Sequence, residues 1–253
     1  MVNMGVEKET IVIALIIGFV FVASQHVSIP LDIGKNLQSP FQPSENIDAK
    51  FEKRMAYLHV PAVDDQGRGI STILKVEAVP GEGRTLTNID YLLFWVDTQH
   101  SIQTAKIVAA NMTTADLSSI DLIYTIETQA NVIEGPSAGA ALALATIAVL
   151  EDKSLNPDVA ITGTINPDGS IGPVGGILEK AKASKEGGAK IFLVPRGQGF
   201  QTYYSPVKQC RIIGQINYCT VEYKKQTVDI TNEAGIEVRE VANVREALKY
   251  FLA

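Results

Sequence analysis

Ser137 and Lys180 are the two side chains of this sequence whose types and surroundings point to covalent chemistry. Ser137 lies in Gly135-Pro136-Ser137-Ala138-Gly139, which matches the G-x-S-x-G pattern. In that pattern the glycines allow a tight turn that presents a serine nucleophile at the start of a helix. A serine hydroxyl is a poor nucleophile at neutral pH without a base. The sequence therefore indicates a nucleophilic serine whose base has to come from another part of the chain.

The histidines do not supply that base in the order that an α/β-hydrolase needs. That fold places its acid and then its histidine after the serine, whereas His26, His59 and His100 all precede Ser137. A Ser-His-Asp arrangement in another chain order would have to use His59 or His100. Both have the local context of structural residues, one in a predicted strand and one at a predicted helix start, so this arrangement is disfavoured.

Lys180 meets the condition for a lysine base, because burial lowers the pKa of an amine toward neutrality. It lies in GGILEKAKASKEGG, where helical spacing places Ile177, Lys180, Ala181 and Ser184 on one face. The charged neighbours of Lys180 project elsewhere. A lysine in a helix is usually solvated. The hypothesis that Lys180 is a base therefore depends on its pairing with Ser137 and not only on its position on an apolar helix face.

The elements that must position these residues alternate between helix and strand. Apolar spacing predicts helices over residues 99–111, 136–150, 176–186 and 244–251. Patterns rich in β-branched residues predict strands over residues 57–63, 70–79, 120–128, 191–194 and 236–241. Residues 159–165 and 170–174 are expected to pair as a hairpin around Asn166-Pro167-Asp168-Gly169. The fold class expected is α/β (α+β), a sandwich of mixed sheet and packed helices.

An apolar run of 13 residues, 11–23, lies near the N-terminus. Residues 10–29 would span about 30 Å as a helix, close to the thickness of a bilayer core. We expect residues 1–30 to be a signal anchor that holds the chain in a membrane, while a cleaved signal peptide with a site at Val22-Ala23-Ser24 and a buried core helix are the alternatives. Residues 30–44 carry three prolines and little periodicity, so residues 31–54 are expected to be a linker, followed by one domain over 55–253.

Charge and cysteine usage bear on partners and compartment. The formal charge is −6, the isoelectric point is near 5.2, and Lys and Arg are scattered along the chain. We therefore expect no nucleic-acid partner. Cys210 and Cys219 flank what reads as a small hairpin in an otherwise irregular stretch, and they are either a disulfide of an oxidising compartment or two free thiols. The sequon Asn111-Met112-Thr113 adds weakly to an extracytoplasmic placement. Cell-membrane attachment with an extracytoplasmic domain is therefore expected, with export after signal cleavage as the alternative.

The chain resembles the proteolytic domain of Lon proteases in three motifs that follow in order: 134–139 (EGPSAG), 162–165 (TGTI) and 172–180 (GPVGGILEK). The offset of 43 positions from Ser137 to Lys180 also suits that family. The resemblance implies a fold like that of ribosomal protein S5 domain 2, with a hydrophobic helix in front of it here. Residues 201–227 look like an insertion relative to the family.

The resemblance also implies a role for each matching residue. Ser137 would attack the scissile carbonyl and Lys180 would accept its proton. Thr162 matches a threonine whose hydroxyl bonds the catalytic lysine, and Glu134 matches an acidic position near the dyad. Gly135 forms the turn before the serine. The backbone N–H of Ser137 and the following helix start would face the oxyanion.

No G-x-x-x-x-G-K-[ST] motif occurs in the sequence, so no ATPase activity is expected of it. The predicted Ser-Lys chemistry needs no cofactor or metal, and none is expected. The predicted function is ATP-independent serine endopeptidase cleavage of peptides or unfolded proteins, with a homo-oligomeric ring implied by the family. Two alternatives are a catalytically idle Lon-like binding or scaffold domain and a proteolytic subunit served by a separate ATPase. A signal-peptidase-type enzyme is disfavoured, because it would place its serine just after the hydrophobic segment.

Overall fold

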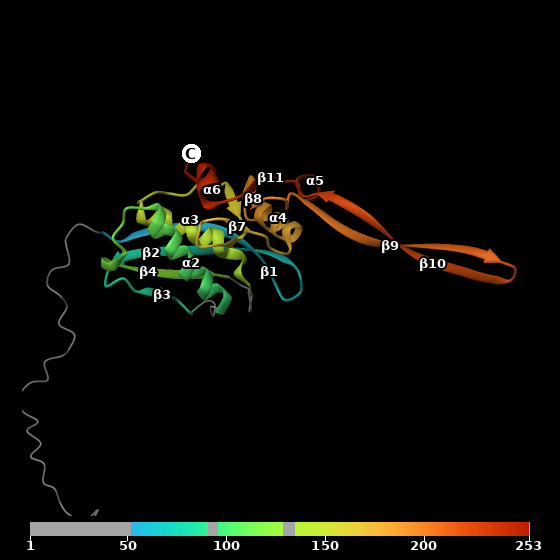
Figure 1. Ribbon diagram of the computed structural model, residues 1–253, viewed down its shortest axis with the longest axis horizontal. Coiled ribbons are helices and arrows are strands. Elements are labelled where there is room, and N and C mark those ends of the chain that lie inside the picture. The colour runs from blue at the N-terminus through green and yellow to red at the C-terminus, as the bar shows by residue number, and fades with distance from the viewer. Residues whose placement is uncertain (1–51, 91–95, 129–134, 253) are drawn as a thin grey trace, which may run out of the picture. The chain divides into compact units, whose positions relative to one another are not determined.

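The computed structural model describes residues 52–90, 96–128 and 135–252 (Figure 1). The predicted hydrophobic segment, most of the predicted linker and Glu134 lie outside these residues. Within the described ranges, no helix combines the length and the apolar character needed to cross a membrane. The membrane anchor therefore stays a prediction.

The first sheet has four strands in the order β1-β2-β4-β3, with the parallel β3–β4 pair at one edge and antiparallel pairing elsewhere. Its strands are β1 (Arg54–Val63), β2 (Gly69–Pro80), β3 (Thr85–Thr87) and β4 (Ile120–Glu127). Along β1, Ala56, Leu58 and Val60 are buried while Tyr57 between them is exposed, which is the alternation of a strand with one face on the core. The strands predicted over 57–63, 70–79 and 120–128 are confirmed.

Helix α3 (Gly139–Leu150) forms the centre of the body, and all of its residues are buried. It packs against β1, β2 and α2 (Val96–Met112). Its alanines bring the backbone close to these neighbours, because a small side chain keeps packed elements near one another. The predicted helix over 136–150 is confirmed except for its first turn, where Pro136–Ala138 form the 3-10 helix η2. A second short 3-10 helix, η1 (Leu117–Ser119), precedes β4.

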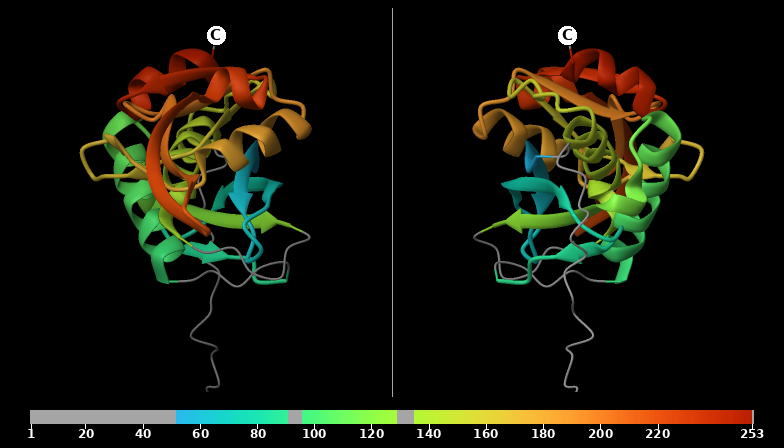
Figure 2. Two further views of the ribbon diagram at one scale, coloured as in Figure 1. Left: turned by 90° about the vertical axis from the view of Figure 1, so that its right-hand side faces the viewer. Right: turned by 90° about the vertical axis from the view of Figure 1, so that its left-hand side faces the viewer.

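A second, fully parallel sheet has the order β11-β8-β5. Its strands are β5 (Val159–Ile161), β8 (Ile191–Pro195) and β11 (Glu237–Val241). The helices near it are α4 (Ile177–Glu186), α5 (Ile230–Ala234) and α6 (Val244–Phe251). Figure 2 shows the C-terminal elements on the side of the body opposite β3. The fold is thus mixed α/β as expected, with its strands divided between separate sheets rather than joined in one.

The hairpin predicted over 159–165 and 170–174 is correct only at its centre. Strand β6 (Thr164–Ile165) pairs with β7 (Ile171–Gly172) around the Asn166–Gly169 turn. The first part of the prediction is wrong, because β5 leaves this hairpin and joins the parallel sheet beside β8. A short apolar run does not reveal which strand will pair with it.

The irregular stretch expected around the cysteines is instead a long hairpin. Strand β9 (Phe200–Ile213) pairs with β10 (Ile216–Asp229) over its whole length and projects from the rest of the body (Figure 1). Cys210 lies directly opposite Cys219, and the two form a disulfide. The hairpin contains the whole predicted insertion, residues 201–227.

Candidate active site

Ser137 lies in the η2 turn at the mouth of the buried helix α3. Gly135 precedes it with φ of +96°, a region that residues with a Cβ rarely adopt, so the glycine of the motif is needed for the turn. The Ser137 carbonyl accepts two hydrogen bonds, from the backbone N–H of Gly163 at 3.0 Å and from the Thr162 hydroxyl at 3.3 Å. The N–H of Ala140 donates back to the Gly163 carbonyl at 3.0 Å. These bonds hold the serine turn to the 162–165 segment.

Lys180 lies one turn into α4, where its backbone N–H donates to the Gly176 carbonyl at 2.9 Å. Gly176 caps the helix with φ of +65°, and a Cβ there would stand 2.7 Å from the side chain of Val63. The predicted face is confirmed, since Ile177, Lys180, Ala181 and Ser184 are all buried. Only 4% of Lys180 is exposed. Burial lowers its pKa from 10.5 to about 8, because an apolar environment disfavours the charged ammonium.

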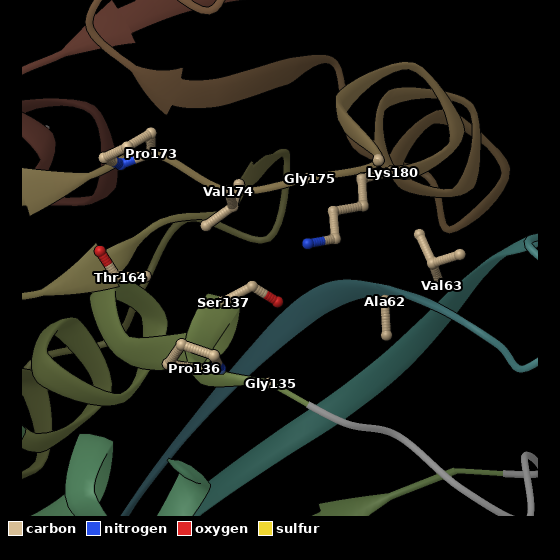
Figure 3. Close-up of a pocket in the computed structure, with 11 residues that line it drawn as sticks. Ala62, Val63, Gly135, Pro136, Ser137, Thr164, Pro173, Val174, Gly175 and Lys180 are labelled. Carbon is tan, nitrogen blue, oxygen red and sulfur yellow. The ribbon is translucent and has the colours of Figure 1, made fainter.

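A cavity of about 430 Å³ contains both residues. Figure 3 shows the Ser137 hydroxyl and the Lys180 amine entering it from different elements, with Ala62 and Val63 on one side and Val174 on another. The full lining is Ala62, Val63, Gly135, Pro136, Ser137, Thr164, Pro173, Val174, Gly175, Gly176 and Lys180. No hydrogen bond joins the Ser137 hydroxyl to Lys180 among the described residues.

The backbone around Ser137 can also stabilise negative charge. The N–H of Ser137 belongs to the first turn of η2, where helical N–H groups lack a partner within the helix. Helix α3 follows directly and directs the positive end of its dipole toward this turn. When the Ser137 hydroxyl attacks a carbonyl carbon, the oxyanion that forms on the carbonyl oxygen could accept a hydrogen bond from this donor.

The supporting residues predicted from the sequence have different outcomes. Gly135 forms the turn before Ser137 and also lines the cavity. Thr162 is fully buried, but its hydroxyl bonds the Ser137 carbonyl, and in the described part of the chain it makes no hydrogen bond to Lys180. Thr162 therefore orients the serine turn here. Glu134 lies outside the described residues, so its role stays a prediction.

Several wall residues carried no chemical signal in the sequence. Thr164, Pro173 and Val174 lie within the motifs, but nothing in the sequence marks them as cavity residues. Ala62 and Val63 come from a strand far from those motifs. A narrow second recess adjoins Ser137 on the side of β1, β2 and β4. Its wall is mainly apolar: Val60, Pro61, Ala62, Thr72, Leu74, Thr98, Ile126, Gly135, Ser137 and Ala138.

The described ranges contain no group of three or more His, Cys, Asp or Glu side chains that could hold a metal ion. The functional groups that line the cavity are the hydroxyls of Ser137 and Thr164, the buried amine of Lys180 and backbone amides. Together they can perform nucleophilic acyl chemistry assisted by a general base.

Comparison with known proteins points to the same segment of the chain. Residues 96–206 match the family model of the Lon protease (S16) C-terminal proteolytic domain. An archaeal Lon protease of Thermococcus kodakarensis is 28% identical over 154 residues, which cover 60% of this chain and 24% of that protein. Lon proteases of Phenylobacterium zucineum and Koribacter versatilis are 32% identical over 128 residues and 42% identical over 62 residues. These matches cover 49% and 24% of this chain, but only 16% and 8% of those relatives.

Proposed function

We propose that the chain is a serine endopeptidase with Ser137 as nucleophile and Lys180 as general base, and that it is one of the proteins related to the Lon protease (S16) C-terminal proteolytic domain, whose family model residues 96–206 match. The single observation that carries the proposal is the cavity shared by a serine on a glycine-dependent turn and a lysine that is 4% exposed. The chain spans a quarter or less of the length of these relatives. Its activity is therefore inferred from its own site.

In the proposed reaction the Ser137 oxygen forms a bond to the scissile carbonyl carbon while its proton passes to the neutral Lys180 amine. The carbonyl oxygen becomes an oxyanion beside the Ser137 N–H. When the tetrahedral species collapses, the C–N bond breaks and the leaving amine takes the proton from Lys180. Water then attacks the acyl-enzyme carbonyl while Lys180 again accepts a proton. The ester C–O bond breaks and Lys180 returns that proton to the Ser137 oxygen, which releases the carboxylic acid and regenerates the serine.

Lys180 must be neutral to accept a proton, so its pKa decides the working pH. With a pKa of about 8, roughly a tenth of the amine is neutral at pH 7, whereas an exposed lysine would be neutral in fewer than about one molecule in a thousand. Activity therefore rises with pH until the amine is mostly deprotonated above about pH 8. Burial of Lys180 thus supports catalysis near neutral pH.

The substrates proposed are peptides and already unfolded proteins. A cavity of about 430 Å³ accepts a few residues of an extended chain rather than a folded surface. Cleavage is proposed not to require ATP, since the printed residues contain no nucleotide-binding P-loop. A ring of identical subunits is proposed from the family alone.

We also propose that residues 10–29 attach the chain to a membrane and that the proteolytic domain lies outside the cytoplasm. The hydrophobic run supports attachment. The disulfide between Cys210 and Cys219 supports an oxidising compartment. Labelling of intact cells with an impermeant thiol reagent, before and after reduction, tests this placement, and protected thiols after reduction would contradict it.

The test of the function is cleavage of unfolded casein without ATP by a fragment that begins at residue 31. Wild type, Ser137→Ala, Lys180→Ala and the distant control Lys224→Ala are compared. We expect wild type and Lys224→Ala to cleave and the two site variants to lose cleavage. Cleavage by Ser137→Ala at the wild-type rate would contradict the proposal, and an inactive wild type would favour the idle scaffold.

A further inference from the structure

Gln198 makes an unusual pair of contacts with the wall of the cavity. Its side-chain carbonyl accepts the backbone N–H of Val174 at 3.0 Å, and its NH₂ group donates to the Val174 carbonyl at 2.7 Å. A primary amide presents one acceptor and one donor on the same edge. The Gln198 amide therefore pairs with both the backbone N–H and the backbone carbonyl of Val174, as the backbone of a neighbouring β-strand would.

The segment that Gln198 contacts is the wall loop, residues 173–176. All four of its residues line the cavity with Ser137 and Lys180. The loop begins with Pro173, which has no N–H, and ends with two glycines, whose backbones lose the most freedom on ordering. Among the described residues, the amide of Gln198 is the one group outside α4 that hydrogen-bonds to the loop backbone.

Gln198 is itself held from the opposite side. Its backbone N–H donates to the Pro195 carbonyl at 3.1 Å, which closes a turn after β8. On either side of it, the Arg196 N–H donates to the Val241 carbonyl at 3.1 Å and the Gly199 N–H donates to the Glu240 carboxylate at 2.8 Å. These bonds tie the turn to β11. The side chain of Gln198 thus extends from an anchored turn to an otherwise weakly bonded loop.

The wall loop leads directly into the helix that carries the base. Gly176 ends the loop and accepts the hydrogen bond from the Lys180 N–H. A shift of Val174 would therefore open the wall beside the amine and displace the first turn of α4. A displacement of about 1 Å at a reacting group is enough to slow an enzyme severalfold or more.

We infer that Gln198 is a positioning residue of this site, whose amide clamps the backbone of Val174 and so fixes the wall loop and the start of the Lys180 helix. The expected effect of Gln198 on the rate of peptide cleavage rests on the proposed function. The clamp itself is a property of the fold and can be measured without activity.

The test compares Gln198→Leu, which removes both hydrogen bonds at similar volume, with Gln201→Leu, the same change three residues away at an exposed position. We expect Gln198→Leu to raise hydrogen exchange at the Val174 amide about tenfold, since two net hydrogen bonds are lost. On casein-derived peptides we expect kcat to fall about tenfold while KM stays within about threefold, because positioning of the base acts on the chemical step. Gln201→Leu should match wild type in all three quantities.

A rescue variant separates a clamp from general loss of structure. In Gln198→Glu the ionised carboxylate can accept from Val174 but cannot donate to its carbonyl, whereas the protonated carboxyl can do both. The ratio of Val174 exchange in Gln198→Glu to that in wild type should therefore fall as the pH is lowered from 7 to 4. For Gln198→Leu the same ratio should not change with pH.

Each outcome decides the inference. If wild type is inactive, the proposed function fails, and Val174 exchange alone then tests the clamp. Unchanged exchange in Gln198→Leu overturns the clamp. Raised exchange with an unchanged kcat in an active enzyme overturns the positioning role. Raised exchange, acid rescue and a selective loss of kcat support it.

Discussion

The cavity and the β9–β10 hairpin are ordered by different kinds of contact. Ser137 and Lys180 are carried by elements that pack into the interior, one on the turn before the fully buried α3 and one on the buried face of α4. The hairpin has 14 residues in each strand and nearly all of its side chains are exposed. The hairpin is held together by the backbone hydrogen bonds between β9 and β10, by its disulfide and by a two-residue turn in which Gly214 has φ of +65°. Burial in the body therefore lowers the pKa of Lys180, while the hairpin buries almost none of its side chains.

The largest effect is expected at Lys180. Lys180→Met keeps the volume of the side chain but removes the base, so the rate of cleavage should fall at least about a thousandfold. The same change should raise the free energy of unfolding by about 3 kcal/mol at pH 7, because the folded state no longer holds an ammonium that burial disfavours. Peptide cleavage and urea denaturation measure the two effects. A variant that loses both activity and stability would indicate a structural lysine instead.

The next effect distinguishes the interior of the body from the hairpin. Leu144 is fully buried in α3, so Leu144→Ala should reduce the free energy of unfolding by about 3 kcal/mol. Tyr223 on β10 is 70% exposed, and Tyr223→Ala should change that free energy by less than about 0.5 kcal/mol. Urea denaturation of both variants provides the comparison. Equal destabilisation would mean that the hairpin packs against something in solution.

A smaller and local effect is expected from the disulfide. It closes a loop of ten residues, Cys210–Cys219, which corresponds to about 2–3 kcal/mol of chain entropy in the open hairpin. Replacing both cysteines by serine should raise hydrogen exchange in β9 and β10 and leave exchange in α3 unchanged. Peptide cleavage should also persist. Loss of exchange protection in α3 would show that the hairpin and the body unfold together.

The sequence predicted best those elements whose side chains face a core. The buried face of α4 and the bounds of α6, Val244–Phe251, follow from helical apolar spacing, and both predictions are confirmed. The sequence predicts only a small hairpin between the cysteines. The full length of β9 and β10 does not follow from it, because both faces of these strands are exposed and lack the alternation of apolar and polar residues that marks a half-buried strand. Pairing of β5 with β8 was missed because it joins segments about 30 residues apart.

The same contrast holds within the site. Ser137 and Lys180 could be found because their chemistry requires those residue types on a glycine turn and an apolar helix face. The wall of the cavity could not be predicted from the sequence, because Ala62, Val63 and Val174 contribute only to its shape. That shape arises only when segments distant in the sequence pack together. Gln198 has ordinary composition and neighbours in the sequence, and its contact with Val174 depends on an anchored turn and a loop 24 positions away.

The most direct test of the central claim, that buried Lys180 activates Ser137, is the rate at which a fluorophosphonate labels Ser137 between pH 6 and pH 10. Below the pKa of the base the rate should rise about tenfold for each pH unit, and it should level off near pH 8. Mass spectrometry should locate the adduct on Ser137, and Lys180→Met should abolish both the labelling and its pH dependence. Labelling that proceeds equally well without Lys180, or that levels off only near pH 10.5, would contradict the account.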